Sequence, residues 1–357
     1  MQRKNTCLTS FIHKQLDQRE AFFCRFHYFL SSVYVLNIRI VLNIHPPKEK
    51  VKHLRFEDPF FSTLHLRNGG ICTILYGRIK VFHTTCIYGE QNMSIRPTAV
   101  VADGAVIGDG VEIGPFVYVG PNVKIGDGCR LLAHCVVDGY TTMGARNTVH
   151  PFATLGGPAQ DHGVEPGAKT FLQIGDDNDF REGFTAHTGT KPDTCTVIGN
   201  HNMFMAQSHV AHNCQIGNNV IYVNSACTAG YTQIFDNAIL SGLVAIHQFC
   251  RVGRFAMVSG CSAFSLDVPP FMIAEGRNGG VKTINIVGLT RAGFSADAIK
   301  NIKEIYKIYY RSGLIVGKAL EKIRTELPQT PEVVEFLEFC ANTKKGVVGP
   351  HREGRRG

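Results

Sequence analysis

Hydrophobic and polar positions repeat every six residues along the middle of the chain, from Ile95 to Pro270. A branched aliphatic residue opens each block, Gly usually follows it, and a small or aliphatic residue takes the fifth place, as in the blocks at Ile107 and Ile113. An α-helix would not keep Gly at every sixth position, whereas a fixed short period is typical of a solenoid. The pattern predicts a triangular coil with three blocks per turn, in which the aliphatic side chain points inward and Gly helps to turn each corner.

The repeat returns after each interruption, in blocks that begin at Val197, Ile216, Ile234 and Val252. Stacked at the usual strand spacing of about 4.8 Å, roughly nine coils would form a prism on the order of 45 Å long. A globular β-sandwich does not explain the pattern, because its strands alternate with a period of two. We therefore predict a parallel β-helix over residues 93–270.

Beyond Pro270 the apolar residues are spaced by three and four, which is typical of amphipathic helices. Ser295 can cap a helix that runs to about Ser312. A second helix is expected from about Val316 to Glu326, and Pro331 is suited to open a third. The pattern thus predicts a small α-helical domain after the prism.

The first part of the chain differs from the rest. Residues 1–92 lack the six-residue period and show no steady helical or strand alternation. Met93 stands directly before the first recognisable coil, so we predict that the natural product begins there and that the prefix is an upstream over-extension; a disordered, targeting or membrane-anchoring segment is the alternative. The apolar stretch at residues 26–44 is interrupted by Asn37 and Arg39 and makes a poor membrane span.

The expected domain organisation has four parts. After the prefix (residues 1–92) and the β-helix (93–270), the helical domain covers residues 271–343. A basic, Gly-rich tail over residues 344–357 has too few apolar residues to pack, so we expect it to be flexible.

Charge and cysteine content limit the possible partners. Residues 1–92 hold 13 Lys/Arg and 6 Asp/Glu, a net +7, so the remaining 24 basic and 23 acidic residues carry only +1 of the total +8. The repeat region is therefore nearly neutral and no nucleic-acid-binding motif is present, which argues against nucleic acid as a partner. The 12 cysteines form no Cys-x-x-Cys pair. This usage predicts reduced thiols in a cytoplasmic protein, with no metal site of zinc-ribbon type.

The densest group of reactive side chains is the segment Ser208 to Cys214, which contains His209 and His212. In the phase of the repeat Val210 opens a block, so His212 should point outward, and an exposed histidine on a rigid face can act as a general base. His209 ends the previous block, so the repeat does not place the two rings side by side.

Further histidines recur in neighbouring coils. His187 precedes this segment, and the pair His247-Gln248 follows it. A lone histidine would best be interpreted as a solvated surface residue. Because side chains on one face of successive coils stack, however, these residues together can line one groove.

Several longer motifs add to this picture: Gly156 to Asp161, Arg181-Glu182 with His187, Ala245 to Cys250, Asp267-Val-Pro-Pro270 and Asn285 to Phe294. With these motifs, the chain from about Ser94 to the third helix resembles the acyl-ACP–UDP-N-acetylglucosamine O-acyltransferases, which begin lipid A biosynthesis. Other hexapeptide transferases share the coil but not the helical tail.

The resemblance implies a left-handed β-helix, a homotrimer with active sites between neighbouring prisms, and acyl carrier protein and UDP-N-acetylglucosamine as substrates, without a metal or other cofactor. It implies that His212 is the general base, that the Gly230 N–H binds the oxyanion, and that Asn213 is the catalytic partner of His212. Gly260 matches the position that limits the acyl groove, and Gly at this position favours a long chain. The implied substrate-binding residues are Gln160, Asp161, His187, His209, His247, Gln248, Gly260, Asn285 and Arg291.

The chain departs from the family pattern at several places. Asn213 stands where the family has an acidic residue, Tyr231 replaces a histidine, Val287 replaces a glutamate, Ala292 replaces an arginine, and the expected lysine is missing after Asp161. These changes leave two alternatives: a related N-acyltransferase that modifies the 2-amino group of a UDP-glucosamine, and a catalytically altered paralogue. A third alternative, a zinc hydrolyase on the same coil, would need three histidines around one metal, two of them usually five residues apart, whereas His209 and His212 are three apart.

Overall fold

The structure, a computed structural model, describes residues 95–165, 167–277 and 279–350 in full and, before them, the backbone of strands between residues 51 and 85. The chain divides into two compact units, Met1–Gln91 and Asn92–Gly357. The apolar stretch at residues 26–44 lies outside the described residues. Within the described part, no helix is long and apolar enough to cross a bilayer.

The first unit contains an antiparallel sheet of four strands, which the sequence pattern did not predict. The strands are β1 (Val51–Leu54), β2 (Phe61–Arg67), β3 (Ile71–Tyr76) and β4 (Ile79–Thr85). Each pairs with the next along the chain. Apolar and polar residues do not alternate strictly in this segment, so alternation did not reveal the strands. β3 and β4 are instead rich in Ile, Val, Thr and aromatic residues, which favour strands by themselves.

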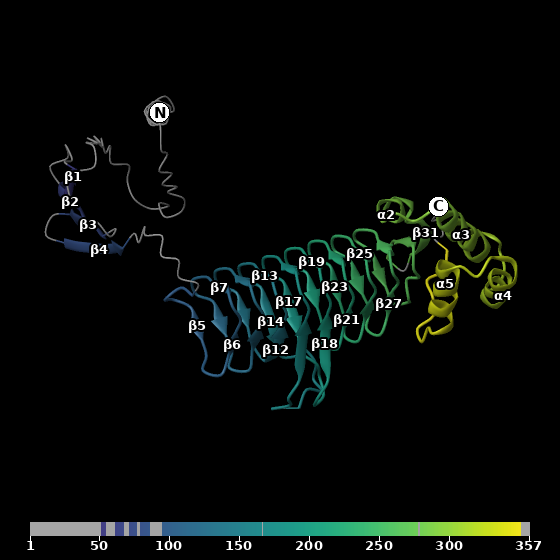
Figure 1. Cartoon of the computed structure of the whole chain (residues 1–357), viewed down its shortest axis with the longest axis horizontal. Coiled ribbons are helices and arrows are strands. Elements are labelled where there is room, and N and C mark those ends of the chain that lie inside the picture. The colour runs from purple at the N-terminus through teal and green to yellow at the C-terminus, as the bar shows by residue number, and fades with distance from the viewer. Residues whose placement is uncertain are drawn as a thin grey trace, which may run out of the picture. The chain divides into compact units, whose positions relative to one another are not determined.

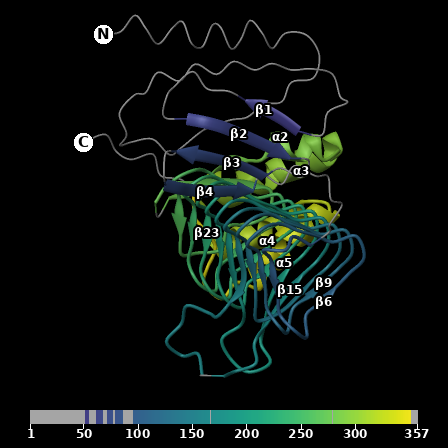
Figure 2. The ribbon, with the colours of Figure 1, turned by 90° about the vertical axis from the view of Figure 1, so that its left-hand side faces the viewer.

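The second unit is a left-handed parallel β-helix of three sheets, as predicted (Figure 1). The sheets hold ten, nine and eight strands, and consecutive strands of the chain from β5 to β30 belong to different sheets. Paired residues in the regular coils lie three six-residue blocks apart, for example His209 opposite Cys227 and Cys227 opposite Ala245. Figure 2 looks along the prism and shows the coils stacked behind one another.

The strands of the prism are short and their bounds are regular. The ten-stranded sheet contains β7 (Glu112–Ile113), β10 (Arg130–Leu131), β13 (Thr148–Val149), β16 (Asp179–Phe180), β19 (Met203–Phe204), β22 (Ile221–Tyr222), β25 (Ile239–Leu240), β28 (Met257–Val258), β30 (Met272–Glu275) and β31 (Gly280–Ile284). The nine-stranded sheet contains β5 (Val100–Val101), β8 (Tyr118–Val119), β11 (Val136–Val137), β14 (Thr154–Gly157), β17 (Thr185–His187), β20 (His209–Val210), β23 (Cys227–Thr228), β26 (Ala245–Ile246) and β29 (Ala263–Phe264). The eight-stranded sheet contains β6 (Val106–Ile107), β9 (Lys124–Ile125), β12 (Tyr140–Met143), β15 (Phe171–Ile174), β18 (Cys195–Ile198), β21 (Gln215–Ile216), β24 (Gln233–Ile234) and β27 (Arg251–Val252).

The aliphatic residue that opens each block forms the core, as expected. Ile113, Val119 and Ile125 are at most 3% exposed. Cys129 and Cys135 fill core positions as small apolar side chains, and burial raises the pKa of the Cys135 thiol to about 12. The cysteines of the described part are free thiols, and Cys261 is exposed. Burial keeps the core cysteines protonated and unreactive; these are Cys129, Cys135, Cys214, Cys250 and Cys340.

The corners of the coils differ from the prediction. The Gly after the aliphatic residue does not turn the chain: a Cβ atom would stand 2.8 Å from backbone of the next coil at Gly108 and 2.6 Å at Gly126. These positions need Gly because neighbouring coils approach closely. The left-handed backbone conformation comes two residues later, and residues other than Gly often adopt it, such as Phe116 (φ 59°) and Asn213 (φ 60°).

Two excursions leave the prism at the edge between the nine- and eight-stranded sheets (Figure 1). The first, residues 158–170, joins β14 to β15, and the second, residues 188–194, joins β17 to β18. Thr170 Oγ1 donates a hydrogen bond to Thr188 Oγ1 over 2.8 Å, which ties the end of the first excursion to the start of the second. The excursions therefore form one layer beside the corner that follows β20.

The helical region begins later than the sequence pattern predicted. β30 and β31 form a hairpin that extends the ten-stranded sheet, and a short helix, α2 (Ile286–Arg291), follows it. The three expected helices are confirmed as α3 (Ala296–Tyr306) continued by η1 (Lys307–Arg311), α4 (Val316–Glu326) and α5 (Pro331–Ala341). The Ser295 hydroxyl caps α3 by accepting from the Ala298 N–H.

The start of the tail is ordered, contrary to the prediction. The Asp267 N–H donates to the Gly346 carbonyl, the Val348 N–H donates to the Asp267 carbonyl, and Val348 is 1% exposed. Residues 344–350 therefore pack against the end of the prism. Residues 351–357 lie outside the described part of the chain.

A buried ion pair joins the prism to the helices. The Asp267 carboxylate is 1% exposed and accepts from Arg251 Nε at 2.9 Å and from Thr343 Oγ1 at 2.7 Å. Arg251 also donates to the Phe339 carbonyl of α5. The Asp267-Val-Pro-Pro motif thus ends the prism and holds the last helix against it.

Candidate active site

Histidines from two neighbouring coils meet at one edge of the nine-stranded sheet. The rings of His187 and His209 pack edge to face with their centroids 4.9 Å apart, and His209 Nδ1 is 2.7 Å from Thr185 Oγ1. Burial, together with the nearby His209 and His212, lowers the pKa of His187 to about 4, and burial also lowers the pKa of His209. Both rings are therefore neutral near neutral pH. The ring contact joins His209 to His187, whereas the pair that the repeat phase left open was His209 and His212.

His212 lies at the corner after β20 and is buried, whereas the sequence predicted an exposed ring. It is 7% exposed, because the two excursions cover the corner from outside. Asp161 of the first excursion places its carboxylate 3.7 Å from His212 Nε2. On the other side, His212 Nδ1 is 3.0 Å from Asn213 Oδ1. The ring is thus held between a fixed acceptor and a half-exposed carboxylate.

Gly230 stands directly beside this ring in the next coil. A Cβ atom at Gly230 would lie 2.2 Å from His212 Cε1 and 2.5 Å from Nε2. Only Gly leaves room for the imidazole in this position. The Gly230 N–H makes no hydrogen bond within the described residues, so it is free to donate to a group bound next to His212.

The remaining predicted residues do not all meet in one copy of the chain. Gln160 on the first excursion, and His247 and Gln248 after β26, are exposed at the same edge as His212. Gly260 lies between β28 and β29, at a different edge of the prism.

Asn285 and Arg291 lie at the two ends of α2, beyond the last coil. The Asn285 side chain is used within the fold, because its Oδ1 accepts from the Gly288 N–H and its Nδ2 donates to the Phe255 carbonyl. Arg291 is exposed. One copy therefore assembles the histidine edge but not the positions at Gly260 and α2.

Sequence reasoning missed Thr190. This buried residue of the second excursion contacts Asn213 through both its N–H and its hydroxyl. It belongs to no hexapeptide block, so the repeat phase could not place it. The available signal was the Thr188-Gly-Thr190 segment directly after His187.

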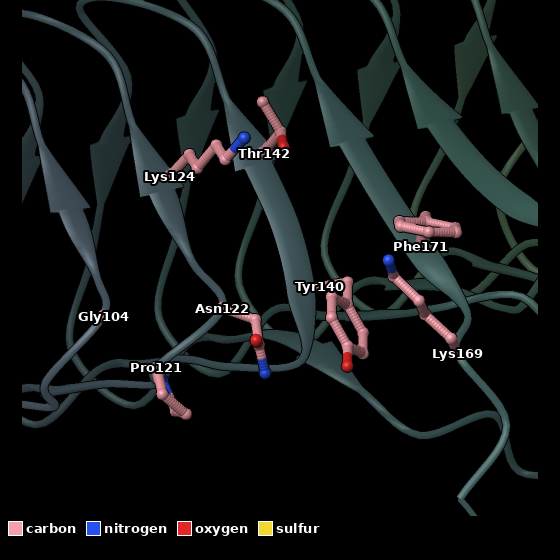
Figure 3. A pocket seen from close by; sticks show the side chains of 8 residues that line it. All are labelled: Gly104, Pro121, Asn122, Lys124, Tyr140, Thr142, Lys169 and Phe171. Carbon is pink, nitrogen blue, oxygen red and sulfur yellow. The ribbon is translucent and has the colours of Figure 1, made fainter.

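A cavity of about 310 Å³ opens on the eight-stranded sheet and contains none of the predicted site residues (Figure 3). Its walls include Lys124, Tyr140, Lys169 and Phe171. The Lys169 ammonium lies over the rings of Tyr140 and Phe171, at 5.0 and 5.4 Å from their centroids. This lysine is already engaged with aromatic rings.

The zinc hydrolyase alternative needs three histidines placed around one metal ion. Among the described residues, no group of three His, Cys, Asp or Glu side chains is arranged to hold a metal ion. His187, His209 and His212 are neighbours, but two of the rings are directed to other partners, Thr185 and Asn213.

Comparison with known proteins identifies the family. Residues 267–348 match the family described as UDP N-acetylglucosamine O-acyltransferase, domain 2, and residues 104–139 match the bacterial transferase hexapeptide family. The acyl-[acyl-carrier-protein]–UDP-N-acetylglucosamine O-acyltransferase of Sinorhizobium fredii is 42% identical over 264 residues, which cover 73% of this chain and 97% of that protein. The chain belongs to this O-acyltransferase family. The protein of the same name from Anaeromyxobacter is 44% identical over 257 residues, covering 72% of this chain and all of that protein.

Solved structures agree with this O-acyltransferase assignment. The UDP-N-acetylglucosamine acyltransferase of Bacteroides fragilis is 41% identical with a TM-score of 0.68, covering 71% of this chain and 99% of that one. The enzyme from Francisella novicida is 35% identical with a TM-score of 0.69, covering 71% and 94%. The predicted family and the acyltransferase class are confirmed, and these relatives give no support to the N-acyltransferase alternative.

Proposed function

We propose that this O-acyltransferase moves an acyl chain from acyl carrier protein to the 3-hydroxyl of UDP-N-acetylglucosamine, the first step of lipid A biosynthesis, with His212 as the general base. The hydrogen bond between His212 Nδ1 and Asn213 Oδ1 at 3.0 Å carries the residue assignment. An amide oxygen can only accept, so the imidazole proton is on Nδ1 and the lone pair is on Nε2. Nε2 is directed toward Asp161 at the excursion side of the edge.

The reaction follows from this arrangement. His212 Nε2 takes the proton from the sugar hydroxyl while the hydroxyl oxygen attacks the thioester carbon. The Gly230 N–H stabilises the negative oxygen of the tetrahedral intermediate. The carbon–sulfur bond then breaks, and the imidazolium returns the proton to the departing thiolate of the carrier protein. The residues of the chain thus supply the proton transfers and the oxyanion donor, without a metal.

Neighbouring side chains would hold the acceptor sugar. Asp161 and Gln160 approach from the first excursion, and His187, His209, His247 and Gln248 flank His212 along the edge. Since His187 and His209 have lowered pKa values, they would bind the uncharged hydroxyl and amide groups of the sugar as neutral hydrogen-bond partners.

The site is proposed to be completed by a second copy in a homotrimer. His212 and Gly260 occupy different edges of one prism, and Asn285 and Arg291 are at its end. A groove that uses all of them needs two prisms side by side. Gly260 has room for a Cβ atom, whose nearest neighbour would be the Gly242 carbonyl at 3.4 Å. The absence of a side chain there is not required by the fold, which supports a role in leaving a long acyl groove open.

The proposal extends to the part of the chain that is needed for activity. We expect residues 93–350 to be sufficient for activity in the cytoplasm, where the free cysteines of the described part would stay reduced. Removing the sheet of residues 51–85 tests this expectation.

His212→Ala tests the base assignment directly. A positioned general base supplies about 10²–10⁴ in rate, so kcat for transfer from acyl carrier protein should fall by that order. His201→Ala is the matched control, because His201 lies at another edge of the prism, and it should keep wild-type kcat. A near-normal kcat for His212→Ala would contradict the proposed mechanism.

A further inference from the structure

Three groups contact the side-chain oxygen of Asn213. Its Oδ1 accepts from the Thr190 N–H at 3.1 Å, from the Thr190 hydroxyl at 3.0 Å and from His212 Nδ1 at 3.0 Å. A backbone N–H can only donate, so the atom that faces Thr190 must be the amide oxygen and not the amide nitrogen. The orientation of the amide is therefore decided by Thr190.

Tyr231 extends the same network. Its hydroxyl lies 2.9 Å from Thr190 Oγ1. Because the single proton of the Thr190 hydroxyl is directed at Asn213, Tyr231 must donate to Thr190. The Tyr231 ring also packs edge to face on His212, with centroids 5.4 Å apart, and stacks on Phe249 at 4.9 Å.

The orientation of this amide decides which nitrogen of His212 can act as the base. With Oδ1 toward the ring, Nδ1 carries the proton and Nε2 is free. If the amide turned over, its NH₂ group would face Nδ1 and favour the opposite tautomer, with the proton on the catalytic nitrogen. A carboxylate has no such problem, since both of its oxygens accept. In a serine protease, Asp→Asn at the corresponding place lowers kcat about 10⁴-fold because the wrong tautomer is favoured.

We infer that Thr190 and Tyr231 are positioning residues that lock the amide of Asn213, and thereby replace the orienting function that a carboxylate would perform alone. Thr190 supplies two donors to the amide oxygen, and Tyr231 fixes the direction of the Thr190 hydroxyl. His212, Asn213 and Thr190 are all at least nine-tenths buried, so water does not compete for these groups. The inference rests on the proposed role of His212.

Kinetic measurements on single variants give the first test. Thr190→Val keeps the N–H and the shape but removes the hydroxyl, and we expect kcat to fall about 10-fold; Tyr231→Phe should lower it about 3-fold. KM for both substrates should change less than about twofold, because the proposed role of both hydroxyls is to orient Asn213 and not to bind substrate. Thr190→Ser is the control: it keeps the hydroxyl, and its kcat should stay within about twofold of the wild type.

The decisive comparison repeats Thr190→Val and Tyr231→Phe in the Asn213→Asp variant. A carboxylate needs no orientation, so each change should now lower kcat by less than about twofold. A purely structural role would produce the same loss in both backgrounds. Equal losses with Asn213 and with Asn213→Asp would overturn the inference.

The tautomer of His212 can be read without catalysis. In ¹⁵N NMR spectra of the full chain, assigned by comparison with His212→Gln, the neutral ring should be protonated at Nδ1, and Thr190→Val should increase the Nε2-protonated form. A wild-type ring protonated at Nε2 would overturn the inference whether or not the protein transfers acyl groups. Loss of the proposed function alone would instead appear as a normal kcat for His212→Ala.

Discussion

Gly230→Ala probes the closest contact in the site. The added Cβ atom would lie 2.2 Å from His212 Cε1, 2.5 Å from Nε2 and 2.8 Å from Nδ1, whereas ordinary contacts begin at 3.4 Å. The imidazole must therefore move by about 1 Å or more, away from Gly230. A displacement of about 1 Å in a catalytic group can cost about 10²-fold in rate, or about 2.7 kcal/mol of transition-state stabilisation. The Gly230 N–H itself is retained in this variant.

We therefore expect kcat for Gly230→Ala to fall about 100-fold, with little change in the melting temperature, because the clash is with one side chain at a corner. The assay is transfer from acyl carrier protein to UDP-N-acetylglucosamine under saturating substrate. Gly242→Ala is the matched control: it is also a glycine at a corner of the prism, but its Cβ atom would be 3.6 Å from the nearest atom, the Asn224 carbonyl oxygen. A kcat for Gly230→Ala within threefold of the control would refute the steric reasoning.

Two further predictions concern stability. The pKa of His187 is about 4 in the folded chain and about 6.5 when unfolded, so the unfolded chain binds the extra proton between these values and stability should fall as pH drops through that window. His187→Gln should flatten the dependence of the melting temperature on pH there, and an unchanged slope would argue against this cause. Asp267→Asn leaves the Arg251 guanidinium without its buried partner and should lower the free energy of unfolding by about 3–5 kcal/mol in denaturant titrations. Glu112→Gln, which breaks an exposed ion pair with Arg130, should lower the free energy of unfolding by less than about 0.5 kcal/mol. If both variants lost the same free energy, burial of the Asp267 pair would not explain its contribution.

Much of the fold was predictable because each coil repeats one physical requirement. A single inward position per block, such as Ile113 or Val119, has to be aliphatic to fill the prism. The three-to-four spacing of α3 to α5 was predictable for the same reason, since each helix buries one stripe. The hairpin of β30 and β31 was not, because it forms where the last coil offers a free sheet edge, which no local pattern records.

The candidate site was only partly predictable. The motif around His212 and the family resemblance named the proposed base, the proposed oxyanion glycine and most of their neighbours. They did not reveal that His212 is buried, because its cover comes from the excursion that carries Asp161, which lies outside the repeat. The contacts of Thr190 with Asn213 were also hidden, since Thr190 lies on the second excursion, outside the repeat.

The six-residue period alone determined the β-helix, because every coil must present the same shape to the next. The sequence also determined where α3, α4 and α5 begin and which histidine segment faces a corner. Only the tertiary structure decided which edge each site residue occupies, how the excursions bury His212, and that the tail up to residue 350 packs on the prism. The physical reason is that these features arise from contacts between distant segments, and a short repeat constrains neighbours one coil away but not the segments that leave the coil.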